Sequence, residues 1–388
     1  MQNTRWPNEL TNVRWFAAGQ CPTKVFAIVT CHCFADLVKR AAPKTFNKLK
    51  PPHHSENKIN FTNTANIHQE YNSARHNRLS AFHSPGGRAA GDCLCLGYWD
   101  HAGTGDWFNP LNCGPNHNAV PDCGVSCGYP WEVDINNGGT AQINTGTAQA
   151  CETFLGKDTR QQSGNLSVNN GTLNQCGDMW VGYHGKGTLS ITNGGVVNTQ
   201  FGAHIAANAG SSGSATVDGT NSKWTVTVDG AGLNVGGINS SEGGTGLLTV
   251  KNSGTVTAAS VHAWKSGTLT GNGTVSTTGG TTIDGTLAPT GTLAISGDLG
   301  FGPGGTMHCN VSSSGWDRAE VSGTATVNGK LSVTLTGFFT GDFPILHASS
   351  LIGTFSSFSA TYTGCLAPSI VYDYVNGYVY LHVEATCQ

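Results

Sequence analysis

The chain carries the stretch Gly164-Asn-Leu-Ser-Val-Asn-Asn-Gly171, and the repetition of this stretch decides the fold. Each copy is a glycine, a short run of alternating apolar residues, and a corner rich in Asn, Asp and Gly. Three further copies follow: Gly187-Thr-Leu-Ser-Ile-Thr-Asn-Gly-Gly195, Gly213-Ser-Ala-Thr-Val-Asp-Gly219 and Gly246-Leu-Leu-Thr-Val-Lys-Asn-Ser-Gly254. Alternation at period 2 is the signal of a β-strand, and the corners tolerate the positive φ of tight turns. The repeat therefore predicts an all-β chain of short strands.

A second series of apolar residues lies between these copies and keeps step with them. The opening glycines stand at 164, 187, 213 and 246, so their steps are 23, 26 and 33 residues. The second series steps by 26, 24, 30 and 26 residues and consists of Leu155, Val181, Ile205, Val235 and Val261. Two series with similar steps indicate at least two strands in fixed phase in every repeat.

Antiparallel hairpins are one way to arrange such strands, because the corners suit hairpin turns. However, the step is too long for one hairpin and too regular for a sandwich, and the sequence lacks the long helical patterns of βαβ units. We therefore predict a β-solenoid, in which each strand pairs in parallel with its copy in the next turn. Three interior columns are expected: the second series itself; Leu166, Leu189, Ala215 and Leu248; and Val168, Ile191, Val217 and Val250.

Composition supports a folded chain and argues against one class of partner. Charged residues make up only 11 % of the 388 residues and Gly contributes 54, but the apolar positions are periodic, which favours a solenoid over disorder. The net charge of −3 argues against a nucleic-acid partner. The charge is unevenly distributed, because residues 1–90 hold 12 of the 20 Lys and Arg and only four of the 23 acids.

Four regions are predicted from these patterns. Residues 1–90 form a basic, poorly ordered N-terminal segment. Its apolar residues 25–35 are an export signal, a short buried strand, or part of an upstream extension foreign to the natural product. Residues 91–130 form a cysteine-rich N-cap, residues 131–300 carry the parallel β-helix repeats, and residues 301–388 form the C-terminal β-helix end with an aromatic cap. Within the last region, residues 370–383 are typical of a hairpin with Asn376-Gly377 as its turn.

The 13 cysteines are the main clue to the compartment. Five of them lie between 91 and 130, where disulfides of an exported protein, a zinc site and free thiols are the alternatives; we favour disulfides because the spacing fits no common zinc finger. Cys151 and Cys176 precede Leu155 and Val181 by four and five residues, so they should be neighbours in successive turns. A disulfide between them is therefore predicted.

The repeat motifs also resemble those of a known class. Trp180-Val-Gly182 followed by Gly187–Gly195, together with Asp218-Gly-Thr-Asn-Ser-Lys-Trp224, resembles the repeat shared by autotransporter passenger domains and PEP-CTERM-type surface proteins of bacteria. Leu287-Ala-Pro289 and Phe343-Pro-Ile-Leu346 look like the C-terminal end of such passengers, and the similarity covers roughly residues 98–385. The resemblance implies a right-handed parallel β-helix that is exported to or beyond the outer membrane. It implies no shared catalytic residues.

Two groups of side chains are candidates for chemistry or binding. Asp158, Asp178 and Arg160 are the one acidic and basic cluster that could serve a polysaccharide lyase or hydrolase of this fold. Trp180, Trp224 and Trp264 could stack on a ligand such as a surface glycan. Binding predicts the three indoles exposed on one side, whereas packing predicts them buried on different sides, and we favour packing.

We therefore expect a secreted or cell-surface structural protein with an adhesive role and without enzymatic activity. The alternative is a polysaccharide-binding or polysaccharide-degrading β-helix protein. We expect no cofactor and no metal site, because the sequence has no phosphate loop, nucleophile elbow, His-Glu-x-x-His or recurring calcium nonapeptide. We also expect no transmembrane segment, because no C-terminal apolar stretch of about 20 residues is present. The partners expected are surface glycans or a host or neighbouring cell surface.

Overall fold

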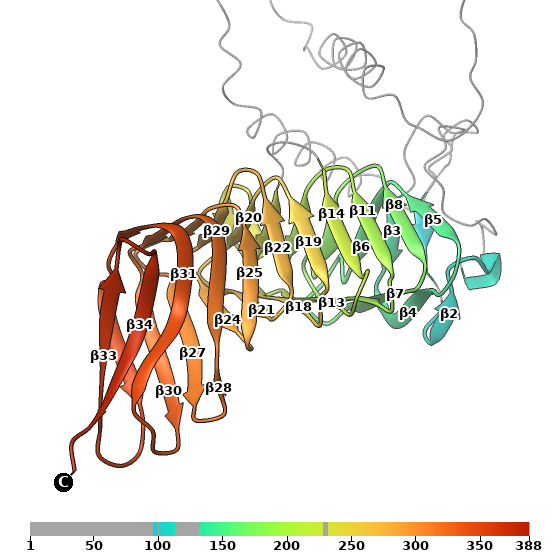
Figure 1. Cartoon of the computed structure of the whole chain (residues 1–388). Helices are drawn as coiled ribbons and strands as arrows, with labels where there is room; N and C mark the ends of the chain where they lie inside the picture. Colours follow the sequence, from blue (N-terminus) through green and yellow to red (C-terminus); the bar gives the residue numbers. More distant parts are fainter. Residues whose placement is uncertain (1–95, 100, 113–131, 228–231, 388) are drawn as a thin grey trace, which may run out of the picture. The chain divides into compact units, whose positions relative to one another are not determined.

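The computed structural model describes residues 96–99, 101–112, 132–227 and 232–387, which form a stack of parallel β coils (Figure 1). A coil in the middle of the stack has three strands in chain order, as in Ser163–Asn169 (β7), Thr172–Gln175 (β8) and Met179–Val181 (β9). Each strand pairs in parallel with the equivalent strand of the coils before and after it. The prediction of an all-β parallel solenoid is confirmed.

Equivalent strands form three faces along the stack. The first face contains β7 and Thr104–Asp106 (β2), Asn137–Ile143 (β4), Lys186–Thr192 (β10), Ser212–Asp218 (β13), Thr245–Lys251 (β18), Gly267–Gly271 (β21), Thr286–Pro289 (β24), Thr306–Ser312 (β27), Lys330–Thr336 (β30) and Ser357–Thr361 (β32). The second face contains β8 and Thr147–Ala150 (β5), Val196–Thr199 (β11), Lys223–Val226 (β14), Thr255–Ala258 (β19), Thr274–Thr277 (β22) and Thr292–Ser296 (β25). The third face contains β9 and Leu96–Tyr98 (β1), Glu132–Ile135 (β3), Glu152–Leu155 (β6), Ala203–Ile205 (β12), Leu233–Val235 (β15), Val261–Ala263 (β20), Thr281–Ile283 (β23) and Leu299–Phe301 (β26).

The register between coils places the predicted core residues above one another. On the first face, Leu189 pairs with Leu166 and Ala215, and Ala215 pairs with Leu248. The column that contains Ile191 aligns in the same way. All of these residues are at most 1 % exposed and belong to one continuous core. The two predicted first-face columns are therefore confirmed.

The predicted third-face column is right for four members and wrong for Val261. Val181 pairs with Leu155 and Ile205, and Ile205 pairs with Val235. Val235 then pairs with Ala263, while Val261 pairs with Leu233 in the neighbouring column. The four correctly aligned residues each precede a corner residue with a left-handed φ, which marks the same position in each coil. Ala263 precedes Trp264 instead, so this coil lacks the corner residue by which its sequence could be aligned with the others.

The C-terminal end departs from the three-strand coil. Arg318–Val327 (β29) continues both the second and third faces and pairs in parallel with Gly341–Gly353 (β31). Tyr378–Ala385 (β34) then pairs antiparallel with β31 and with Leu366–Asp373 (β33). The predicted hairpin is confirmed, with Asp373 paired to Tyr378 across a turn that contains Gly377 at φ 75°. Phe355 is buried, and Phe339, Phe343, Phe358 and Tyr372 pack partly buried against the core, as expected of an aromatic end.

The predicted basic segment with its apolar residues 25–35 and the five cysteines of the predicted N-cap lie outside the described residues, which do not include 1–95 and 113–131. Parallel pairing starts before residue 131, since β1 pairs with β3 and β2 pairs with β4. Trp99 and Trp107 belong to the core. Short pieces complete the described elements: Gly237–Ile238 (β16) with Ser241–Glu242 (β17), Gly315–Trp316 (β28), and the 3-10 turn Pro110–Asn112 (η2).

Replacing Val235 with Asp should unfold the middle coils. Val235 is fully buried between Ile205 and Ala263, and a buried unpaired charge costs several kcal/mol. Thr257→Asp is the control, because Thr257 lies on β19 with its side chain exposed, where a substitution changes stability by about 0.5 kcal/mol or less. Denaturant unfolding followed by circular dichroism measures both. Equal stability of Val235→Asp and the native chain would contradict the interior column.

Ala206→Gly should stabilise the chain by about 0.5–1 kcal/mol. Ala206 occupies, at φ 59°, the corner position that Gly156, Gly182 and Gly236 fill at φ 69°, 78° and 78°. Relief of about 1–2 kcal/mol of left-handed strain exceeds the extra chain entropy of glycine, about 0.5–1 kcal/mol. Gly182→Ala is the opposite control and should destabilise, because its methyl group would meet the Ser212 carbonyl. The midpoints of chemical unfolding test both signs.

Candidate functional site

The outer side of the third face carries one continuous ladder of side chains. Its members are the middle residues of successive short strands, which point outward because the residues on either side of each point into the core. Strand register aligns them in this order: Asp134, Phe154, Trp180, His204, Asn234, His262, Thr282 and Gly300, with Thr326 of β29 next. We call this set the outer ladder.

The first half of the outer ladder is covered and aromatic. The ring of Trp180 stacks on Phe154 with centroids 5.7 Å apart and on His204 at 4.3 Å. Tyr183 packs edge-on against both Phe154 and Trp180. Ala207 and Ile238 complete this second, smaller apolar cluster outside the main core. Burial raises the pKa of the Tyr183 phenol, as expected for a hydroxyl that is partly withdrawn from water.

Side chains from the connections that follow the third-face strands cover part of the ladder. The connections that follow the third-face strands run over residues 156–162, 182–185, 206–211 and 236–244 in the early coils. The later connections run over residues 264–266, 284–285 and 302–305 after β20, β23 and β26. The side chains that pack over the Phe154–Trp180 stack all come from the early connections, and they are Tyr183, Ala207 and Ile238. The outer ladder is buried at Asp134 to Asn234 and open from His262 onward.

A buried ionic cluster lies at the covered end of the ladder. The Lys157 ammonium forms ion pairs with Glu132 and Asp134 and lies 4.5 Å above the Phe154 ring. All three charged side chains are at most 11 % exposed. Desolvation raises the pKa of the Asp134 carboxyl well above its ordinary value, and the nearby carboxylates of Asp158 and Glu152 add to the rise. The cluster joins β3 to the connection that follows β6, so its role is structural.

The open end of the ladder begins with an ordered polar and aromatic group. The Trp264 indole N–H donates to the Asn234 amide oxygen at 3.0 Å, and the ring lies 3.9 Å from the His262 ring. His262 Nε2 is 2.7 Å from Asp284 Oδ2. The His262 and Asp284 side chains are 25 % and 37 % exposed, and Trp264 is partly exposed. These groups are held in place and still reach solvent.

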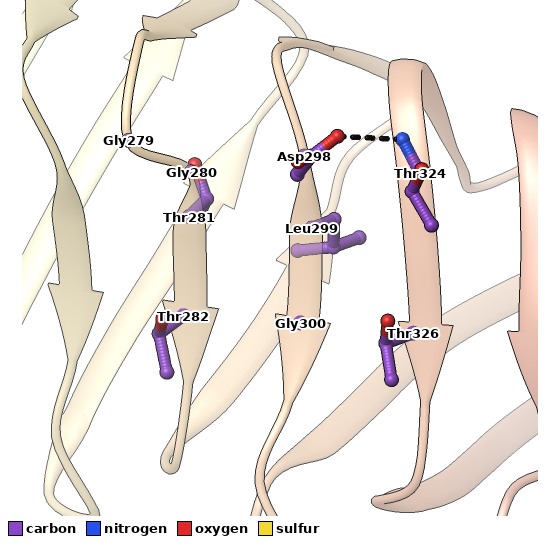
Figure 2. Close-up of a pocket in the computed structure, with 9 residues that line it drawn as sticks. All are labelled: Gly279, Gly280, Thr281, Thr282, Asp298, Leu299, Gly300, Thr324 and Thr326. Carbon is purple, nitrogen blue, oxygen red and sulfur yellow. Dashed lines mark hydrogen bonds between the residues drawn. The ribbon is translucent and has the colours of Figure 1, made fainter.

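Beyond His262 the ladder opens into a shallow depression of about 320 Å³ (Figure 2). Its lining comes from β23, β26 and β29 and the turns before them. Thr282 and Thr326 stand on either side of Gly300, which has no side chain to fill the space between them. Asp298 lies at the edge, where its Oδ1 accepts a hydrogen bond of 2.7 Å from the Thr324 N–H.

The structure separates the three predicted tryptophans. Trp224 lies inside the main core, fully buried, and its indole N–H donates to Thr199 Oγ1 at 3.1 Å. Trp180 is 8 % exposed under its covering loop, and Trp264 is partly exposed beside His262. A ligand face made of all three is therefore wrong, because Trp224 points inward from β14. Trp264 remains available for binding.

The predicted acidic and basic cluster is also wrong. Asp178 is buried at the corner before β9, where its Oδ1 accepts a 2.7 Å hydrogen bond from Gly202 N. Asp158 follows the opposite end of β6, where its Oδ2 accepts from Asn136 Nδ2. Arg160 extends to the carbonyl of Ala209. Asp158 and Asp178 are therefore about one turn apart in sequence but not adjacent. Asp178 precedes a third-face strand and Asp158 follows one, and these two kinds of corner lie at opposite ends of the strands.

The described cysteines include one pair in adjacent coils and one disulfide. Cys151 and Cys176 do occupy adjacent coils, since Gly177 N donates to the Cys151 carbonyl and Cys176 N to the Ala150 carbonyl. A disulfide between them stays a prediction. The structure contains a disulfide between Cys365 and Cys387, with Cα atoms 5.3 Å apart, which closes the base of the β33–β34 hairpin. Cys309 is buried in the core, where desolvation raises the pKa of its thiol.

Sequence reasoning missed both the outer ladder and this disulfide. The ladder left a signal, because a large aromatic or polar residue stands immediately before each of Leu155, Val181, Ile205 and Val235. The disulfide left one too, because Cys365 and Cys387 flank the predicted hairpin almost symmetrically about its Asn-Gly turn.

Comparisons with known proteins identify no family for this chain. No protein-family model matches the chain, and no curated protein is similar enough to count as a relative. In the part of the chain that the structure describes, no three His, Cys, Asp or Glu side chains are grouped so that they could hold a metal ion. No helix in the described ranges has the length and apolar character needed to cross a bilayer.

Replacing Lys157 with Met should cost about 3–5 kcal/mol at pH 7, because it leaves two buried carboxylates without their ammonium partner. The loss should shrink as the pH falls. Asp134 has a raised pKa when folded, so the folded variant takes up a proton more readily than the unfolded chain, and acid favours folding. Unfolding midpoints in urea at pH 7 and pH 5 measure this difference.

Lys251→Met is the matched control for that experiment. Lys251 pairs with Asp218 at 3.4 Å on an exposed face, with 42 % and 29 % of the side chains accessible. An exposed pair of this kind contributes about 1 kcal/mol or less. A loss in Lys157→Met that is no larger than in Lys251→Met, or that grows toward pH 5, would contradict the buried cluster.

Proposed function

We propose that the chain is an exported structural β-solenoid of the autotransporter-passenger type, a right-handed parallel β-helix that presents an adhesive face to its surroundings. The observation that carries the proposal is the uninterrupted parallel register from β3 to β26 with one continuous core. Such a stack is a stiff support with a long, weakly charged exterior. That exterior suits contact with another surface.

Three corner carboxylates support a structural role. Asp178 and Asp158 accept hydrogen bonds from a backbone N–H and an amide of their own corners. Asp317 accepts from the backbone N–H groups of Gly291 and Asn310 and from the Asn310 amide. Carboxylates that hold corners together are committed to the fold. A polysaccharide-degrading enzyme would need two carboxylates aimed at one scissile bond.

Binding of polysaccharides without cleavage is the second candidate. It is favoured by the open end of the outer ladder, where Trp264, His262 and Asp284 are ordered and reach solvent. This candidate is compatible with the structural proposal, because an adhesive scaffold needs at least one recognition site.

Export is proposed on the cysteine chemistry. The Cys365–Cys387 disulfide closes a loop with a sequence separation of 22 residues, and disulfides persist in oxidising compartments. In the chain-entropy picture a loop of this size contributes about 3 kcal/mol. In an exported solenoid this disulfide would therefore hold the two ends of the last hairpin together.

Fractionation of native cells with thiol mapping tests this proposal. The protein should be recovered from the culture medium or be cleaved by protease added to intact cells. Peptides that contain Cys365 and Cys387 should be linked until reductant is added. Cys309 is the internal control, because it is a buried free thiol that should react with an alkylating reagent only after denaturation. Recovery in the cytosol with Cys365 and Cys387 both alkylated would overturn the proposal.

A further inference from the structure

The depression on the outer ladder is a grid of six positions on β23, β26 and β29 and in the turns before β23 and β26. Strand register aligns Thr282 with Gly300 and Thr326 in one row. The second row stands two residues earlier on each segment and consists of Gly280, Asp298 and Thr324. With strands about 4.8 Å apart, Thr282 and Thr326 are separated by about 10 Å across the grid. The two glycines leave this part of the face hollow, and Figure 2 shows the two threonines flanking Gly300.

The fold does not require glycine at position 300. Gly280 has a φ of 91°, which favours glycine for conformational reasons. Gly300 is different, because its φ lies outside the left-handed region and a Cβ placed on it would meet no atom within 4 Å. Many other glycines on these faces are enforced by a backbone oxygen of the neighbouring coil. The gap at Gly300 is therefore a property of the surface and not of the packing beneath it.

The groups around the gap have unused hydrogen-bonding capacity. Asp298 Oδ1 accepts from the Thr324 N–H, and within the described residues its Oδ2 has no hydrogen-bond partner. The hydroxyls of Thr282, Thr324 and Thr326 likewise make no hydrogen bond to a described residue. One carboxylate oxygen and three hydroxyls thus surround a space where no side chain stands. Each hydroxyl can both donate and accept, and the carboxylate accepts.

The coil that precedes the grid adds two rings, on and just after β20. His262 is the neighbour of Thr282 in register, and its ring lies against the indole of Trp264. Each ring is held by a hydrogen bond, His262 with Asp284 and Trp264 with Asn234. Rings that are ordered and partly exposed are good platforms for the C–H faces of a ligand.

We infer that this grid is a binding site for neutral, hydroxyl-rich oligosaccharides. A sugar ring offers hydroxyl pairs to Asp298 and the threonines and an apolar face to the Trp264–His262 platform. The grid holds one carboxylate and no basic side chain, so it disfavours uronic acids, phosphates and nucleotides. An isolated carboxylate is also too little to bind a metal ion. The inference rests on the proposed adhesive function, for which it supplies the ligand class.

Affinity at such a shallow site should be weak for one oligosaccharide and strong only in arrays. Little of the ligand surface is enclosed, so a dissociation constant of about 1 mM is expected for a single site. Many copies on a surface facing a polymer would convert weak contacts into firm attachment. This is the behaviour expected of an adhesive solenoid.

Densely immobilised tetrasaccharides of glucose, mannose and galactose, with tetragalacturonate as the acidic counterpart, test the site on the full purified chain. At least one neutral tetrasaccharide should retain the protein, and tetragalacturonate should not. Gly300→Val should weaken retention at least tenfold by filling the gap. Asp298→Asn should weaken it by a similar factor, since it replaces the acceptor oxygen. Thermal unfolding should show that both variants are folded.

Gly315→Val is the matched control. Among the glycines that the structure describes, Gly315 is the other one with an open Cβ position and no left-handed φ, and it lies in β28, which pairs with β27 of the first face. It should bind as the native chain does. Failure of every neutral tetrasaccharide to bind, equal retention of Gly300→Val, or preference for tetragalacturonate would overturn the site. Export is measured separately by fractionation, so loss of the binding site would leave the exported scaffold standing, and the reverse holds too.

Discussion

The parallel hydrogen bonds between successive coils are the interaction on which the rest of this structure depends. Because these bonds hold equivalent strands in register, each residue lies about 4.8 Å from its counterparts in the next coils. Each side chain must therefore be compatible in size and polarity with its counterparts in the coils before and after it. Inside, this produces columns such as Leu166, Leu189 and Ala215. Outside, it produces like-on-like contacts such as the hydrogen bond between the amides of Asn198 and Asn174.

The same register separates the residues that stabilise the coil from the outer residues that are available for recognition. The backbone ladder and the apolar columns recur in every coil, whereas the outer side chains vary from coil to coil. On the third face the early connections supply side chains that cover the strands. They bury the Phe154–Trp180 stack and the Lys157 ion cluster. From His262 onward the outer ladder, including the Gly300 gap, is open to solvent.

Much of the fold could be read from the chain, because each coil repeats the same local signals. Alternation located the strands, and the glycine corners aligned Leu155, Val181, Ile205 and Val235. The alignment failed at Val261, where Trp264 replaces the corner residue. The site was less predictable. Indoles at a similar spacing do not reveal their direction, and Trp224 proved to be core, whereas Trp264 is not.

The sequence by itself determined the parallel coil, the first-face columns and the final hairpin, because period-2 alternation and turn residues act locally and recur in every coil. Only the tertiary structure decided which end of a strand each corner occupies, so Asp158 and Asp178 are separated although they lie one turn apart. It alone set Gly300 between Thr282 and Thr326. These residues come from three different coils, and their adjacency depends on interstrand register, which no single stretch of sequence encodes.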